Sequence, residues 1–250
     1  MCILKAIDSK YSGFTLLELL VTVGVISLLV AVLIPSLLVA KERGRRIVCR
    51  SNIHQFLIGI HSYASETDNA LPSGLSDSGE DEHTPVLSRS TIDMLTELLG
   101  NDRVMVCPWL RKQFDGPVGW NYGEFGYLFI GYNYLGGHGG TPWPLAGLAE
   151  ETWKSPQFTT DKTSKPLLTE LNTWTPYPDH QMSFAPHGSR GPIDDYMKAP
   201  TGKGKTSKEI GAAGGNNGFL DGSAHWKDIE DMKIYRSSRN YDELGCFSAW

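Results

Sequence analysis

The sequence predicts an α+β fold in which a long N-terminal α-helix packs on a small antiparallel β-sheet with long Gly/Pro-rich loops. Apolar character is concentrated at one end, because the only ionisable side chain between Phe14 and Ala40 is Glu18. All seven tryptophans lie beyond residue 100, among many glycines and prolines. With 250 residues, 40% of them apolar, 20% charged and a net charge of -5, the chain is neither disordered nor a multi-span membrane protein nor a dedicated nucleic-acid binder.

The apolar segment is long enough to form a membrane-spanning helix. It runs for 27 residues, and a helical span needs about 20 predominantly apolar residues. A cleavable secretory signal has a shorter apolar core of about 7–15 residues and ends in a small-x-small site. The segment ends in Leu38-Val39-Ala40, which lacks the first small residue. The sequence therefore predicts a transmembrane or filament-core helix over 14–40.

Glu18 stands out near the start of this apolar segment. A charge placed at the centre of a bilayer costs about 2.5–3.5 kcal/mol, so such residues are usually functional or paired. A short polar leader, MCILKAIDSKYSG, precedes Phe14 and carries a net charge of +1. Two interpretations remain open at this point. Glu18 can lie at the membrane interface of a plain signal anchor, or the chain can be processed between Gly13 and Phe14.

The residues GFTLLELLVTVGVISLLVAVLIP resemble the N-terminal signature of type IV pilins and type II secretion pseudopilins. The resemblance implies a pilin-like fold and a leader, 1–13, that a prepilin peptidase removes by cutting after Gly13. It also implies N-methylation of the new first residue, Phe14. Pro35 falls where many pilins carry a proline and would kink the helix.

The resemblance gives Glu18 a role in assembly that agrees with elementary electrostatics. A helix N-terminus carries a partial positive charge, and the free amine of a processed chain adds a full one. In lipid or in a filament core that charge needs a carboxylate. We therefore expect Glu18 of one subunit to pair with the Phe14 amine of a neighbour and to help set the register of the fibre.

The helix is expected to continue beyond the membrane as an amphipathic helix over 41–68. Apolar residues at spacings of three and four form one stripe: Cys49, Ile53, Phe56, Leu57, Ile60, Tyr63 and Ala64. Asn69 and Pro72 mark its end, and 69–250 forms a β-rich globular domain. The run 41–50 has a net charge of +4. The positive-inside rule would keep this run cytoplasmic, whereas the resemblance places the globular domain outside the cytoplasmic membrane.

Later segments resemble a bacterial pseudopilin-like family described by a His-x9-Asp-Gly tail motif. The matching segments are CRSNIHQFLIGIHSYASETDNALP, MVCP, GYNYLGG and NNGFLDGSAHW. The spacing departs from the motif, because 33 residues separate His187 from Asp221 and the expected histidine position is Gly211. The family's histidine is therefore not assigned from the sequence.

Three cysteines remain after loss of a leader that contains Cys2: Cys49, Cys107 and Cys246. An exported domain lies in an oxidising compartment, where disulfides form. The resemblance favours a Cys49–Cys107 disulfide, since both residues lie in the family-like segments. The alternative is that Cys49 is only a small buried apolar residue on the helix stripe.

The sequence predicts no zinc site and no other cofactor, with calcium as a weak alternative. No H-x-x-x-H or C-x-x-C spacing is present. Asp194, Asp195 and Asp221 could supply oxygen ligands to calcium, but they do not have EF-hand spacing. The Asp221-Gly222 pair is better interpreted as the signal of a type I′ hairpin turn.

The predicted function is that of a structural subunit and not of an enzyme, since no catalytic constellation is present. Its expected partners are a prepilin peptidase, other copies of itself, other pseudopilins and an inner-membrane assembly platform. Its expected location is the bacterial cytoplasmic membrane, with the C-terminal domain extracytoplasmic. The alternative is a membrane-anchored module that binds glycans or peptides through exposed aromatics. Those aromatics, which would otherwise fill the core, are Trp109, Trp120, Trp143, Trp153 and Trp174.

Overall fold

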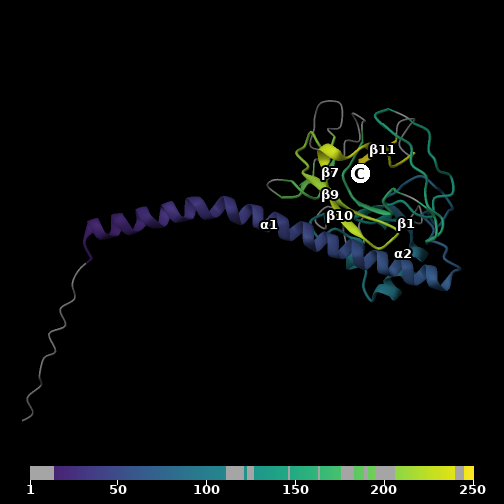
Figure 1. Ribbon diagram of the computed structural model, residues 1–250, viewed down its shortest axis with the longest axis horizontal. Helices are drawn as coiled ribbons and strands as arrows, with labels where there is room; N and C mark the ends of the chain where they lie inside the picture. Colours follow the sequence, from purple (N-terminus) through teal and green to yellow (C-terminus); the bar gives the residue numbers. More distant parts are fainter. Residues whose placement is uncertain are drawn as a thin grey trace, which may run out of the picture. The chain divides into compact units, whose positions relative to one another are not determined.

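A computed structural model describes most of the chain (Figure 1). The described residues are 14–110, 121–122, 127–145, 147–162, 164–175, 183–188, 191–194, 206–239 and 245–250. The predicted leader with Gly13, together with Trp120 and Asp195, lies outside them. The chain divides into two compact units at Lys41/Glu42, with the globular unit extending to Trp250.

Helix α1 (Leu16–Glu66) begins with a reciprocal capping arrangement. The backbone N–H of Glu18 donates to Thr15 Oγ1 at 3.2 Å, and the Thr15 N–H donates to Glu18 Oε2 at 2.9 Å. This Thr-x-x-Glu capping box satisfies two backbone donors at the start of the helix. Helix α1 continues through Pro35 without a break. The kink expected at Pro35 stays a prediction.

Helix α1 ends where two consecutive residues adopt left-handed backbone conformations. Asp68 and Asn69 have φ angles of 51° and 66°, and the Asn69 N–H donates to the carbonyl of Ala64 at 2.8 Å. Such a turn satisfies carbonyls that the end of a helix would leave without partners. The helix therefore stops at Glu66, close to the predicted end at residue 68.

The second half of α1 packs its apolar stripe against the globular unit. Cys49, Ile53, Phe56, Leu57 and Ile60 are all fully buried. The Gly-rich strand β9 (Gly214–Gly218) lets the helix approach closely. A Cβ atom at Gly218 would lie 2.5 Å from Ile53 Cγ2, so a larger residue there would push the helix away.

The fold class is the predicted one: a long, apolar N-terminal helix followed by small antiparallel β-structure, a pilin-like α+β architecture. The single predicted sheet is instead four small sheets among the described residues, with strand orders β1-β3-β2, β10-β9-β5-β4, β11-β12-β6 and β7-β8.

The first sheet contains β1 (Val86–Ser88), β2 (Asn121–Tyr122) and β3 (Tyr127–Phe129). The second contains β4 (Tyr132–Tyr134), β5 (Leu168–Glu170), β9 and β10 (Ala224–Asp228). The third contains β6 (Thr173–Trp174), β11 (Ile234–Arg236) and β12 (Phe247–Ala249), and the fourth β7 (Phe184–Ala185) and β8 (Ile193–Asp194). The strands are short because glycines, prolines and turns interrupt the chain every few residues.

Three short helices complete the described part of the globular unit. Helix α2 (Arg89–Leu99) starts at Ser88, whose hydroxyl accepts a hydrogen bond from the Thr91 N–H, and ends at Gly100 in a left-handed conformation. Two 3₁₀ helices are shorter: η1 (Arg103–Met105) follows α2, and η2 (Ile229–Asp231) lies between β10 and β11.

Four of the described tryptophans, Trp143, Trp153, Trp174 and Trp250, lie in the core of the globular unit. Trp143, Trp153 and Trp174 are each at most 3% exposed. Trp143 and Trp153 belong to one cluster with Tyr235 and Trp250. Within this cluster the rings of Tyr235 and Trp250 stack, with their centroids 4.5 Å apart. Their burial confirms the core-filling interpretation and removes these three residues from the set of exposed aromatics. Trp109 is half-buried, with the Arg45 guanidinium 4.5 Å from its ring centroid.

Candidate functional site

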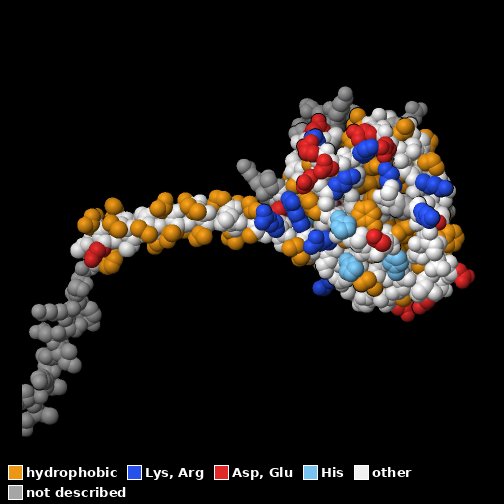
Figure 2. Space-filling model, viewed as in Figure 1, with side chains coloured by type: hydrophobic (Ala, Val, Ile, Leu, Met, Phe, Trp, Pro, Cys, Tyr) orange, Lys and Arg blue, Asp and Glu red, His pale blue; other side chains and the backbone are white. Residues whose placement is uncertain are grey.

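The first half of α1 exposes its apolar side chains along its whole length (Figure 2). Leu17 is 70% exposed and Leu29 is 57% exposed. The most apolar 18-residue window of α1 has a mean hydropathy of 2.7 and buries none of its residues. In the described part of the chain, α1 is the one helix that is long and apolar enough to cross a bilayer. An apolar surface of this size requires lipid or neighbouring helices to cover it.

Glu18 carries the only carboxylate of this segment and has no basic neighbour in it. Within the described residues its carboxylate accepts hydrogen bonds at Oε2, from the N–H and the hydroxyl of Thr15 at 2.9 and 2.7 Å. Those bonds come from uncharged groups, so among the described residues the negative charge has no cationic partner. The side chain is exposed, so a positively charged group of another molecule can reach it.

A second group of polar side chains lies where the second half of α1 meets the sheet. His187 is fully buried, and its ring joins two carboxylates. Nδ1 lies 2.8 Å from Glu42 Oε1 on α1, and Nε2 lies 3.2 Å from Glu170 Oε1 on β5. Burial alone would lower the pKa of His187, but the charge of Glu170 and the hydrogen bonds to Glu170 and Glu42 raise that pKa to about 10.

Both carboxylates have further partners that hold them in place. Burial would raise the pKa of Glu42, but His187 and Arg46 outweigh it and hold that pKa below its usual value. Glu170 accepts from the backbone N–H of Asn216 at 3.0 Å and from its side-chain amide at 2.8 Å. The same amide donates to the carbonyl of Arg46 at 3.0 Å. The network therefore ties α1 to β5 and β9 inside the globular unit.

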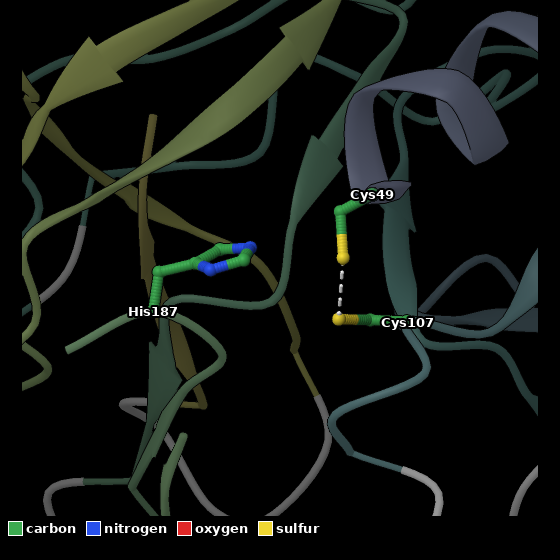
Figure 3. Close-up of side chains that lie close together, drawn as sticks. All are labelled: Cys49, Cys107 and His187. Atoms are coloured by element: carbon green, nitrogen blue, oxygen red, sulfur yellow. Dashed lines mark hydrogen bonds between the residues drawn. The ribbon is translucent and has the colours of Figure 1, made fainter. Parts of the chain in front are cut away.

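Two cysteines lie beside this network (Figure 3). Cys49 on α1 and Cys107 after η1 are both fully buried, and their Sγ atoms are 3.0 Å apart. The donor atoms of Cys49, Cys107 and His187 all lie within 4.8 Å of one another. A disulfide bond is about 2.05 Å long, and both cysteines are thiols in the structure. The predicted Cys49–Cys107 disulfide therefore stays a prediction, although the fold places the two residues together.

The structure places Asp221 in the connection between β9 and β10. Its Oδ1 accepts from the Ser223 N–H at 2.9 Å, and Gly222 has a φ of 81°. The hairpin prediction is confirmed, but the loop is longer than the two residues of a type I′ turn, since Phe219 and Ser223 close it by a hydrogen bond. Asp194 lies at the end of β8. The calcium alternative for these residues stays a prediction.

Sequence reasoning missed the His187 network because its members are far apart in the chain. Glu42 and His187 are 145 residues apart, and Glu170 and Asn216 are 46 apart. The usable signal was Glu170, an acid inside the apolar run PLLTEL. The long gap after His187 also has a structural explanation. The Ala213 N–H donates to the His187 carbonyl at 2.8 Å, so residues on either side of the gap lie next to each other.

Residues 8–34 match a family model described as the prokaryotic N-terminal methylation motif. The chain therefore carries a prepilin-type N-terminal motif that leads directly into the long apolar helix α1. This combination fits the type IV prepilin and pseudopilin-like proteins and is consistent with a single-pass membrane anchor. No curated protein and no solved structure matches the chain.

Proposed function

We propose that this chain is a structural subunit of a type II secretion pseudopilus or a type IV pilus-like fibre. The observation that carries the proposal is the methylation motif at 8–34 followed by a helix half whose apolar side chains are all exposed. A prepilin peptidase cuts between Gly13 and Phe14 and methylates the new N-terminus. Before assembly the processed chain resides in the cytoplasmic membrane, with its globular unit on the extracytoplasmic side.

Assembly exchanges lipid for helices of neighbouring subunits around the first half of α1. Such helices associate through close packing and the pairing of polar groups, because lipid is as apolar as leucine. A mismatched register would leave Glu18 and the Phe14 amine of the neighbour unpaired in an apolar environment, which is costly. The pair thus favours one stagger between subunits. An inner-membrane assembly platform and other pseudopilins are the partners of this step.

The globular unit contributes surface contacts in this proposal and performs no turnover. The alternative, a tethered glycan- or peptide-binding module, depended on exposed aromatics. Among the described candidates, Trp143, Trp153 and Trp174 are buried and Trp109 is half-buried, so no observation on them favours this alternative.

N-terminal mass spectrometry of the protein from its native membrane tests the proposal. We expect N-methyl-phenylalanine at residue 14. Replacement of Gly13 by valine should leave the leader attached, because the peptidase reads the residue before the cut. Gly24→Ala is the matched control, since a Cβ at Gly24 meets nothing within 4 Å, and this variant should be processed normally. An intact Met1 start or a cut after Ala40 in the native protein would contradict the proposal.

A further inference from the structure

The geometry points to a metal site: Cys49, Cys107 and His187 bind one divalent transition-metal ion of the zinc class, with the Glu170 carboxylate as fourth ligand. This site is independent of the proposed role in fibres. It would fasten α1 to the β-structure of the globular unit, because its ligands come from α1, from the segment after η1, from the segment after β7 and from β5.

The donor atoms meet the requirements of a closed, structural site. The four residues are at most 1% exposed. The two sulfurs and an imidazole nitrogen lie within 4.8 Å of one another, and the Glu170 carboxylate adjoins this group through Oε1, 3.2 Å from His187 Nε2. Around zinc, with bonds of about 2.3 Å to sulfur and about 2.0–2.1 Å to nitrogen, tetrahedral ligand atoms lie roughly 3.5–3.8 Å apart. The sulfurs, now 3.0 Å apart, need to separate by less than an ångström. Two thiolates and an imidazole form a donor set that zinc prefers.

Glu42 supplies the outer support that metal-binding histidines usually have. It lies 2.8 Å from His187 Nδ1, so it holds that nitrogen as a donor and leaves Nε2 for the metal. Nε2 is also the nitrogen on the side of Glu170, at 3.2 Å from Oε1. A carboxylate, a histidine and a metal in this order fix both the tautomer and the direction of the ring.

The charges of the surrounding groups balance with a divalent ion in place. The two thiolates offset the cation. The two remaining negative charges, Glu42 and Glu170, are offset by Arg45 and Arg46, which lie 3.6 and 3.4 Å from the Glu42 carboxylate. Binding releases the two thiol protons and the Nε2 proton of His187 to solvent, while the Nδ1 proton stays on the hydrogen bond to Glu42. A buried site with no net charge avoids the cost of an uncompensated ion.

A disulfide between the same two sulfurs is the competing outcome, and it makes a different demand on the neighbours. It needs neither His187 nor Glu170, whereas the metal needs both as ligands. The third buried cysteine, Cys246, lies outside the cluster and provides a matched control.

The full-length protein, purified in detergent without reductant or chelator, tests the site by elemental analysis and thiol alkylation. We expect about one zinc ion per chain, and alkylation of Cys49 and Cys107 in denaturant with chelator but without reductant. Cys107→Ser and His187→Ala should lose the metal, and Cys246→Ser should retain it. Glu42→Gln should weaken binding about 10- to 100-fold in a chelator competition.

Cobalt substitution of the unmutated chain keeps the test valid if a variant fails to fold. Tetrahedral cobalt bound by two thiolates should give intense visible absorption with thiolate charge-transfer bands. Three results would overturn the site: a metal-free chain lighter by two hydrogens and resistant to alkylation, a metal-free chain with both thiols free, or full metal retention in His187→Ala.

Discussion

The two halves of α1 place similar residues in opposite environments. Leu29 in the first half is 57% exposed, and Leu57 in the second half is fully buried against the globular unit. Both belong to one uninterrupted helix. Helix-forming sequence alone therefore does not determine what covers an apolar side chain. The second half finds its cover within the chain, and the first half must find it in lipid or in other subunits.

The acids of the chain show the same contrast. In the globular unit, Asp81 lies 2.7 Å from His138 and Glu42 lies 2.8 Å from His187. In the first half of α1, Glu18 meets only the uncharged groups of Thr15 among the described residues. An acid with an internal partner should affect folding when it is removed. An acid without one should affect what the chain does with other molecules.

The largest expected effect follows replacement of Glu18 by glutamine. Glutamine can keep the capping box with Thr15, because that motif accepts either Glu or Gln, but it removes the negative charge. We expect normal processing and membrane insertion and no fibres in Glu18→Gln, and the same result in Glu18→Ala. Electron microscopy of sheared fibres and N-terminal mass spectrometry measure the two properties separately.

Glu66→Gln is the control for this experiment, since Glu66 is an exposed carboxylate near the other end of the same helix. It should assemble like the unmutated chain. Fibres of Glu18→Gln at the unmutated level, together with their loss in Glu18→Ala, would show that Glu18 acts through the helix cap and not through its charge.

The next effect compares two leucines of α1 directly. Leu57→Ala should lower the free energy of unfolding of the globular unit by about 2–5 kcal/mol, since it removes a fully buried side chain and leaves a cavity. Leu29→Ala should change it by less than about 0.5 kcal/mol. Denaturant unfolding in detergent, followed by tryptophan fluorescence, reports on the globular unit alone because every tryptophan lies beyond residue 100. Equal effects would remove the distinction between the two halves.

The sequence predicted those features that repeat at short range. The apolar run, the stripe from Cys49 to Ala64 and the end of α1 near residue 68 all depend on neighbours within a few turns. The arrangement of strands into several small sheets could not be predicted in this way, since β5 pairs with β9 across more than 40 residues. The Thr-x-x-Glu capping box at Thr15 is a further short-range pattern, and it was not among the predictions.

The buried polar network could be predicted least. No short spacing joins Glu42, Glu170 and His187, and their positions depend on how α1 packs on the sheet. The disulfide prediction named the correct pair of neighbours, Cys49 and Cys107, without naming the histidine beside them. A site whose residues are brought together only by the tertiary fold has no short motif in the sequence. Its one signal here is indirect: an acid, Glu170, within an apolar run.

The smallest effect concerns Asp81, an acid that finds its partners within the chain. Its Oδ1 lies 2.7 Å from His138 Nδ1, and its Oδ2 accepts from the Gly140 N–H at 2.6 Å. Burial would raise the pKa of Asp81, but the hydrogen bond and charge of His138, with Gly140 and Arg239, hold it below the ordinary value of 3.8. Because the folded state lowers this pKa, the stabilisation is fully present above the ordinary value and is lost as the pH falls below it.

Asp81→Asn should therefore lower the free energy of unfolding at pH 7 by about 1.5–3 kcal/mol, the range for hydrogen bonds to charged groups. The difference from the unmutated chain should shrink as the pH falls below 3.8, the ordinary pKa of the carboxyl. Glu80→Gln, a change at the exposed neighbour, should stay within about 0.5 kcal/mol at every pH. At neutral pH, where most of the chain remains folded, Asp81→Asn should still form fibres. Loss of fibres without loss of stability in this variant would mean that acids of the globular unit also act between subunits, and the contrast with Glu18 would fail.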